Sequence, residues 1–161
     1  GKAIRAADCI ETVDSPKLAA RLDRLQGERI SAGELRKDGS PLGPFDVMIQ
    51  VNSAGSESQH GVDPSGVVDL AGAVADLPNL RLVGLMLIGA NTDDVAAVAA
   101  SHARVRELRD AVQAAGVASC TELSMGMTGD MEIAIAEGST EVRVGTAVFG
   151  PRPVMKQTRS Q

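Results

Sequence analysis

Short apolar runs of strand length alternate with helix-like segments along the whole chain. Five runs are typical of strands, at residues 7–14, 46–52, 80–89, 117–125 and 139–145, and a helical segment follows each of the first four. Almost continuously apolar runs that alternate with helices are typical of a parallel sheet with right-handed crossovers. The pattern therefore predicts an α/β fold with five parallel strands.

Two architectures can hold five such strands. An open, doubly wound sheet suits a length of 161 residues, because a (β/α)8 barrel usually takes about 250. The first strand-to-helix turn, however, lacks the glycine fingerprint of dinucleotide-binding sheets. Residues that suit an anion instead follow the last two strands, which is where barrels commonly bind phosphate. The strand pattern by itself leaves both architectures open.

Capping residues and helix breakers predict where the helices begin and end. Ser, Thr and Pro suit the first turn of a helix, and Gly suits the position just after its end. Residues 27–44 are rich in Gly, Pro and charge and are expected to form a loop. The expected starts are Ser15-Pro16, Pro64, Thr92 and Met127, and the expected ends are Gly27, Leu77-Pro78, Gly116 and Gly138.

The composition argues against two classes of partner. The formal charge is -5, Lys and Arg are scattered singly, and the aromatic residues are only Phe45 and Phe149, so nucleic acid is not an expected partner. No apolar run reaches the roughly 20 residues that span a bilayer, and the N-terminal segment lacks the apolar core of a secretory signal. We therefore expect a cytoplasmic protein without membrane contact, with Cys9 and Cys120 as reduced thiols and His102 on the polar side of its helix.

A cluster of small and hydroxylated residues follows the fourth strand-like run. Ser124, Gly126 and Thr128 offer hydroxyl groups and accessible backbone N–H groups, and a helix begins just after them. Backbone N–H groups at the start of a helix favour an anion such as phosphate. The alternative is that Thr128 only caps this helix, and the motif alone gives the two interpretations equal weight.

The last strand-like run ends in a second set of such residues. Gly145 and Thr146 follow it directly, at the edge of the sheet where the preceding strand also ends. By strand alternation, Arg143 points to the same face as Gly145, and a partly buried arginine needs a partner. That partner is either a ligand or a carboxylate, with Glu122 and Glu141 as the candidates.

The C-terminal stretch LSMGMTGDMEIAIAEGSTEVRVGTAVFGPR is very similar to the signature of the YggS/PROSC family of pyridoxal 5'-phosphate homeostasis proteins. The resemblance extends upstream through IETVDSPKLA, IQVNSAGSESQHG and LVGLM, and so covers most of the chain. It implies a (β/α)8 TIM barrel of the alanine racemase N-terminal type that binds pyridoxal 5'-phosphate. The resemblance also implies a monomer.

The resemblance assigns roles to individual residues. Thr128 matches a phosphate-binding hydroxyl residue, Gly145 and Thr146 match the second phosphate-binding pair, and Arg143 matches the arginine that faces the pyridine nitrogen. An arginine is always charged, so it disfavours protonation of that nitrogen and weakens the ring as an electron sink. Together with the turn before Thr128, the expected cofactor-binding residues are Ser124, Met125, Gly126, Thr128, Arg143, Gly145 and Thr146.

The chain departs from the family pattern at its start. The family's cofactor-bearing lysine lies on the first barrel strand, and by this alignment Gly1 and Lys2 come just after the third. Residues 1–161 are therefore expected to form one domain, the C-terminal portion of the barrel with strands four to eight. Leu87, Gly89 and Gln59 differ from residues that are frequent in the family. A barrel section with two open edges would be prone to self-association.

The function implied by the resemblance is to buffer or deliver pyridoxal phosphate inside the cell, without a reaction of its own and with pyridoxal-phosphate enzymes as recipients. One alternative is an amino-acid racemase that uses the same cofactor. That chemistry would need a second acid-base residue such as a tyrosine, and the chain has none. Another alternative is a barrel enzyme that acts on a phosphorylated metabolite. No metal-ligand spacing or catalytic triad is evident.

Overall fold

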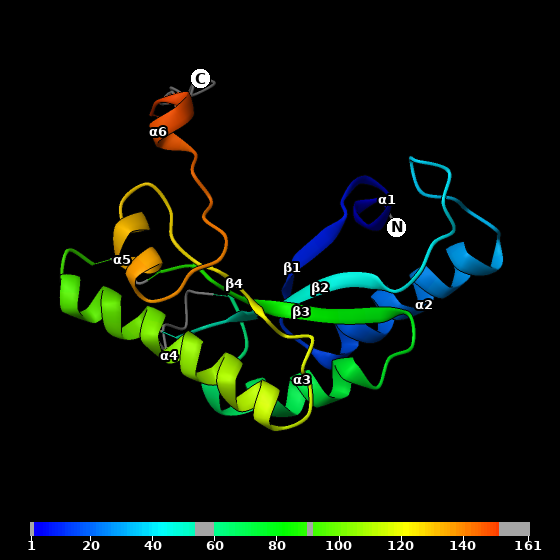
Figure 1. Ribbon diagram of the computed structural model, residues 1–161, viewed down its shortest axis with the longest axis horizontal. Helices are drawn as coiled ribbons and strands as arrows, with labels where there is room; N and C mark the ends of the chain where they lie inside the picture. Colours follow the sequence, from blue (N-terminus) through cyan, green and yellow to red (C-terminus); the bar gives the residue numbers. More distant parts are fainter. Residues whose placement is uncertain (1, 54–59, 90–91, 152–161) are drawn as a thin grey trace, which may run out of the picture.

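A single parallel sheet organises the part of the chain that the computed structural model describes, residues 2–53, 60–89 and 92–151 (Figure 1). Its four strands lie side by side in the order in which they occur in the sequence. A doubly wound sheet reverses its strand order at a switch point, whereas a barrel adds each new strand on the same side. The observed order is that of a barrel section. The strands are β1 (Cys9–Val13), β2 (Phe45–Val51), β3 (Leu80–Leu87) and β4 (Glu122–Ser124).

Three long helices cover one face of this sheet, and the C-terminal segment rises on the other side (Figure 1). The long helices are α2 (Pro16–Ser31), α3 (Val67–Ala75) and α4 (Val95–Ala114), and the 3-10 turn η1 (Pro64–Gly66) leads into α3. The shorter helices are α1 (Ala3–Ala6), α5 (Met131–Ala136) and α6 (Thr146–Phe149).

The core lies between the sheet and the three long helices. Alternate residues of β2, including Val47 and Ile49, are fully buried against apolar side chains of α2 and α3. Because successive strand residues face opposite sides, Met48 and Gln50 lie on the other, concave face, and both are also buried. A strand that is buried on both faces is what a parallel sheet requires. The concave face is therefore an interior surface, and its side chains are placed by the strands.

Several predicted helix ends are confirmed. Ser15 caps α2, with its Oγ accepting a hydrogen bond from the Leu18 N–H at 3.4 Å, and Pro16 is the first helical residue. Gly116 and Gly138 follow α4 and α5 with φ angles of 105° and 91°. These positive φ values favour glycine, as expected for a residue that ends a helix.

Three predicted helix boundaries are wrong. Helix α5 begins at Met131, about one turn after the expected start at Met127. Helix α2 continues through Gly27 to Ser31, so the loop begins about one turn later than expected. A Cβ atom on residue 27 would lie 3.0 Å from the Asn79 side chain, which would have to move slightly to admit it. Helix α4 is capped by Asp94 and not by Thr92. Asp94 Oδ1 accepts from two N–H groups of the first turn, whereas Thr92 Oγ1 accepts only from the Asp94 N–H.

The position of His102 is a further correction. The sequence pattern predicts it on the polar side of α4, but its side chain is fully buried. Alanines occupy much of α4 and make its apolar face hard to locate from the sequence.

The fifth predicted strand, residues 139–145, does not form a regular strand. Only one bridge, between Ser124 and Glu141, joins it to β4. The Met125 N–H donates to the Glu141 carbonyl at 3.0 Å, and the Arg143 N–H donates to the Gly126 carbonyl at 2.9 Å. Gly126 has φ of 92°, so the chain turns away just after β4 and no longer ladder can form. The segment therefore follows β4 in the expected parallel direction, without strand geometry.

No helix in the described ranges has the length and apolarity needed to cross a membrane.

We predict that Gly84→Ala destabilises the protein by about 1–3 kcal/mol. Gly84 lies where β3 approaches β4, and a Cβ atom there would lie 2.3 Å from the Glu122 carbonyl oxygen. Urea unfolding followed by circular dichroism would measure the change. The control is Gly72→Ala on the exposed side of α3, where an added Cβ meets open space and should stabilise by about 0.5–1 kcal/mol. Equal stability of the Gly84 variant and the wild type would contradict the close approach of the two strands.

Candidate functional site

The candidate site lies where β3 and β4 end and the C-terminal segment returns to them. In parallel α/β proteins, ligands bind at the carboxyl ends of the strands, because the loops there meet around one opening. All seven predicted site residues lie in or beside this region, at the end of β4, in the turn after it or in residues 143–146.

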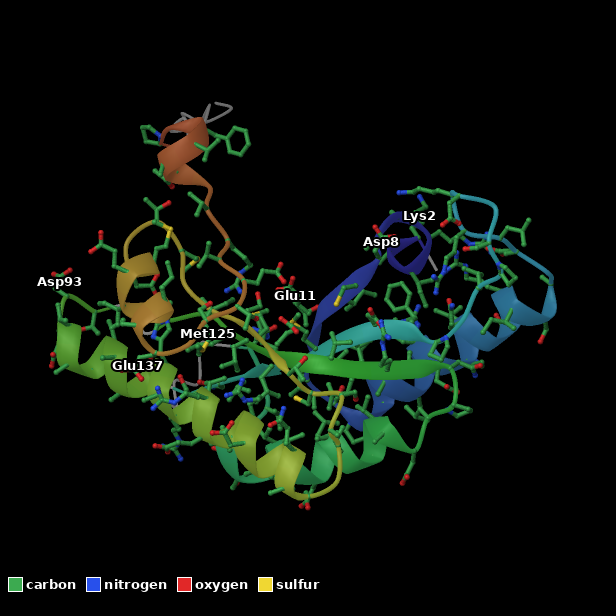
Figure 2. The ribbon with its side chains drawn as sticks, in the orientation of Figure 1. Lys2, Asp8, Glu11, Asp93, Met125 and Glu137 are labelled. Atoms are coloured by element: carbon green, nitrogen blue, oxygen red, sulfur yellow. The ribbon has the colours of Figure 1, made fainter. Side chains whose placement is uncertain are left out.

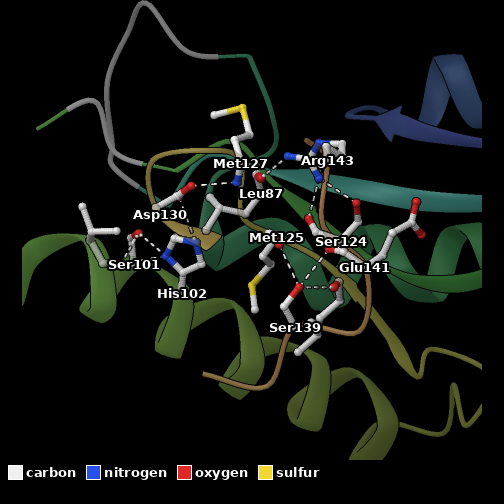
Figure 3. Close-up of polar contacts among 12 residues, drawn as sticks. Leu87, Ser101, His102, Ser124, Met125, Met127, Asp130, Ser139, Glu141 and Arg143 are labelled. Atoms are coloured by element: carbon white, nitrogen blue, oxygen red, sulfur yellow. Dashed lines mark hydrogen bonds and ion pairs between the residues drawn. The ribbon is translucent and has the colours of Figure 1, made fainter. Parts of the chain in front are cut away.

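Arg143 is held by three hydrogen bonds (Figure 3). Its Nη1 donates to the Ser124 carbonyl at 2.8 Å and to Ser124 Oγ at 2.6 Å, and its Nη2 donates to the Leu87 carbonyl at 2.6 Å. Leu87 ends β3 and Ser124 ends β4. One guanidinium group therefore connects the C-terminal segment to two neighbouring strands.

The acidic partner of Arg143 is Glu11 of β1, which the sequence analysis did not identify. Ser124 Oγ donates to Glu11 Oε2 at 2.7 Å, and the same oxygen lies 3.8 Å from Arg143 Nη1. The two predicted partners are wrong: within the described residues, neither Glu122 nor Glu141 forms an ion pair with Arg143, and Glu122 instead accepts from Thr121 Oγ1. Alternation along β1 is a signal that could have pointed to Glu11, because it places Glu11 on the face opposite Ile10.

Acidic groups gather on this concave side of the sheet, where Glu11 lies (Figure 2). Partial desolvation, followed by the negative charge of Glu11 and a hydrogen bond with it, raises the pKa of Glu141. Burial and the charges of Glu11, Asp46 and Glu141 raise the pKa of the Cys9 thiol to about 12. Cys9 is therefore a neutral thiol at physiological pH and is poorly suited to act as a nucleophile.

The turn after β4 is tightly packed. Ser124 and Met125 are fully buried, and the Met125 backbone is engaged on both sides, by the Glu141 carbonyl and by Ser139 Oγ. A Cβ atom on Gly126 would lie 2.6 Å from Ala134 Cβ, so only glycine fits there. These residues therefore shape the turn, and Met125 does so from inside the core.

Thr128 does not cap α5. Its Oγ1 accepts a hydrogen bond from the Ala147 N–H at 3.2 Å, and Asp130 occupies the position just before α5. This bond joins the turn after β4 to the residues that follow Arg143. The two sets of donors therefore lie close together, as the sequence predicts. The capping interpretation of Thr128 is therefore wrong.

Several backbone donors beside this bond are free. Within the described residues, the N–H groups of Thr128, Gly129, Gly145 and Thr146 have no hydrogen-bond acceptor, and all four residues are exposed. An added Cβ on Gly129 or Gly145 would meet nothing within 4 Å. The two loops thus leave open space next to four unpaired donors, which suits an anion.

A buried histidine supports the same turn. His102 Nδ1 lies 2.8 Å from the Val98 carbonyl, and its Nε2 lies 3.3 Å from Asp130 Oδ2 (Figure 3). The other Asp130 oxygen accepts from the Met127 N–H at 2.7 Å. Within the described residues His102 Nε2 forms no hydrogen bond, so the contact with Asp130 is one of close packing between α4 and the turn after β4.

Comparison with known proteins shows which family has this arrangement. The family model described as the alanine racemase N-terminal domain matches residues 1–153. The chain belongs to this family.

The similar proteins include curated relatives and solved structures. A protein named pyridoxal phosphate homeostasis protein from Vibrio cholerae is 41% identical over 145 residues, which cover 90% of this chain and 56% of that protein. PipY of Synechococcus elongatus PCC7942, in a structure with PLP bound, is 33% identical with a TM-score of 0.76, over 92% of this chain and 64% of PipY. An alanine racemase from Clostridium difficile 630 is 18% identical with a TM-score of 0.68, over 94% of this chain and 38% of the racemase, and shows the fold alone.

The chain thus spans just over half the length of the curated relative. Its α/β fold and its sequential parallel sheet are those of a section of a TIM barrel of the alanine racemase N-terminal type. The predicted fold class is confirmed, with four regular strands in place of five.

We predict that Glu141→Gln makes the protein more stable at neutral pH. Because the pKa of Glu141 is raised in the folded state, the stability it contributes is present below about pH 4.5, its ordinary value, and is lost as the pH rises through the folded-state pKa. Glutamine cannot ionise, so the variant escapes this loss. Its advantage should therefore disappear as the pH falls below about 4.5.

Thermal unfolding of the variant and the wild type across this pH range would measure the effect. Glu107→Gln, a change at an exposed residue of α4, is the matched control. A gain in stability that did not depend on pH would contradict the raised pKa of Glu141.

Proposed function

We propose that the protein binds pyridoxal 5'-phosphate in the cytoplasm and takes part in its homeostasis, by buffering the cofactor or delivering it to enzymes that use it. The observation that carries this proposal is the pair of loops joined by the Thr128–Ala147 hydrogen bond. Between them they present to open space two threonine hydroxyls and four backbone N–H groups that have no acceptor in the described part of the chain.

The phosphate group fits the two loops by its charge and its hydrogen-bonding capacity. Thr128, Gly129, Gly145 and Thr146 supply donors, and a phosphate dianion offers several acceptor oxygens. Ser124, Met125 and Gly126 fix the path of the first loop, and Gly126 does so because no larger residue fits. Thr128, Gly129, Gly145 and Thr146 would therefore hold the phosphate.

Arg143 fits the ring of the cofactor. Bound pyridoxal phosphate supplies an electron-withdrawing ring whose strength depends on whether its nitrogen is protonated. Arg143 is always positively charged, and three hydrogen bonds fix its guanidinium group beside the concave face. A fixed positive charge keeps the ring nitrogen unprotonated, which suits a protein that holds the cofactor better than one that performs demanding chemistry with it.

The relatives support this proposal through their names. The Vibrio cholerae relative is named for pyridoxal phosphate homeostasis, and the PipY structure has PLP bound. The racemase alternative has less support, because the chain contains no tyrosine that could act as a second acid-base residue. The free thiols of Cys9 and Cys120 agree with the reducing conditions of the cytoplasm.

We predict that Thr146→Ala lowers the affinity for pyridoxal phosphate about tenfold and leaves the affinity for pyridoxal, which lacks the phosphate, unchanged. A hydrogen bond to a charged group contributes roughly 1.5–3 kcal/mol, and the Thr146 side chain is exposed, so the fold should tolerate its loss. Equilibrium dialysis of both compounds would measure the two affinities.

Thr121→Ala is the matched control, because Thr121 is exposed just before β4, at the opposite end of that strand. Unchanged affinity of the Thr146 variant for pyridoxal phosphate would contradict the proposed phosphate site. Equal loss of both affinities would show that Thr146 contacts the ring instead.

A further inference from the structure

Glu11 and Ser124 meet across the inside of the sheet. They belong to β1 and β4, which β2 and β3 separate. Neighbouring strands lie about 4.8 Å apart, so three steps along a flat sheet would place these strands roughly 14 Å apart. The 2.7 Å bond between Ser124 Oγ and Glu11 Oε2 therefore depends on strong curvature of the sheet.

The direction of each hydrogen bond in this cluster is fixed by chemistry. An ionised carboxylate can only accept, so the single hydroxyl hydrogen of Ser124 goes to Glu11. The lone pairs of Ser124 Oγ then face Arg143, which can only donate. If Glu11 were absent, the Ser124 hydroxyl would be free to rotate, and Arg143 would lose both this fixed acceptor and the nearby negative charge.

The bonds also determine which donors of Arg143 remain for a ligand. A guanidinium group has five N–H donors, and the described residues accept three of them, two at Nη1 and one at Nη2. Both Nη1 hydrogens are used by Ser124. Two donors, at Nε and Nη2, have no acceptor within the described residues and are left for a ligand.

We propose that Glu11 is a positioning residue that acts through the Ser124 hydroxyl to hold the Arg143 guanidinium towards its ligand. The ligand in question is the ring of pyridoxal phosphate, so this part of the inference rests on the proposed function. Glu11 contacts Ser124 Oγ at hydrogen-bond distance and Arg143 at ion-pair distance, and its carboxyl group also interacts with that of Glu141.

Glu141 is a further acidic neighbour of Glu11. The two carboxyl groups interact, and the raised pKa of Glu141 means that this group accepts a proton more readily than usual. The side chains of Glu11 and Arg143 are not deeply buried, because 22% and 28% of their respective surfaces are exposed. A small ligand can therefore reach the cluster.

The first test uses the protein without cofactor. A double-mutant cycle with Glu11→Ala and Arg143→Met would compare the unfolding equilibrium constants of the two single variants and the double variant. We expect the effects to be non-additive by about tenfold, because the residues share one network. Additive effects would overturn the proposal whether or not the protein binds the cofactor.

The second test uses the holo-protein and the absorbance spectrum of its bound cofactor as a function of pH. We expect Glu11→Ala to shift the midpoint of the spectral change by about half a pH unit or more, because Arg143 loses its fixed position and its counter-charge. Glu11→Gln retains an oxygen that can accept from Ser124, so it should restore most of the wild-type spectrum. Glu107→Gln, on the exposed side of α4, is the control.

Each outcome decides between the two proposals. A coupled pair in a protein whose wild type binds no pyridoxal phosphate would overturn the proposed function and leave the Glu11–Arg143 network standing. A coupled pair with a normal spectrum in the Glu11→Ala holo-protein would overturn the positioning role of Glu11. A spectral shift in Glu11→Gln as large as in Glu11→Ala would overturn the proposal that Glu11 acts on Arg143 through the Ser124 hydroxyl.

Discussion

The hydrogen-bond chain from Glu11 through Ser124 to Arg143 is the interaction on which the arrangement of the site depends. It joins the first and last strands of the sheet across the concave face, and Arg143 adds β3 through the Leu87 carbonyl. Burying part of an arginine without hydrogen-bond acceptors costs free energy. The Arg143 side chain and the backbone beside it therefore stay close to their acceptors on Ser124 and Leu87. The curvature of the sheet and the position of the C-terminal segment are therefore linked by one charged group.

The turn after β4 is held by the hydrogen bonds of Arg143 and by the packing of buried residues against it. Gly126 turns the chain, Met125 is buried in the core, and Ser139 Oγ donates to the Met125 carbonyl at 2.7 Å. The buried His102 side chain of α4 packs beside Asp130 of the same turn. Buried or hydrogen-bonded residues thus support both loops of the candidate phosphate site. The exposed N–H groups of these loops are held in place although they form no hydrogen bonds within the described residues.

Much of the fold follows from local patterns in the sequence. Apolar runs locate β1 to β4, Ser15 caps the start of α2, and Gly116 and Gly138 follow the ends of α4 and α5 where their chemistry predicts. The last run, residues 139–145, has the composition of a strand but not its geometry, because the turn at Gly126 shortens the partner against which it could pair. Local propensity cannot report the length of a neighbouring strand.

The sequence could indicate only those contacts of the candidate site that join residues near neighbouring strand ends. Thr128, Gly145 and Thr146 are close along the chain to the strand ends that bring them together, so sequence position was informative. Glu11 lies more than a hundred residues from its partners, and only the curvature of the sheet brings it to Ser124. His102 was placed on the wrong side of α4 because this helix is rich in alanine, which hides its apolar face in the sequence.

The central claim is that the loops at residues 126–129 and 145–147 hold the phosphate of pyridoxal phosphate. Backbone amide chemical shifts, recorded by 1H–15N NMR while the cofactor is added, test it most directly. The account predicts that the largest shift changes occur at these two loops and are absent with pyridoxal. Changes concentrated instead in the cavity of about 420 Å³ at the opposite end of the strands, which Arg5, Arg29 and Arg36 help to line, would contradict it.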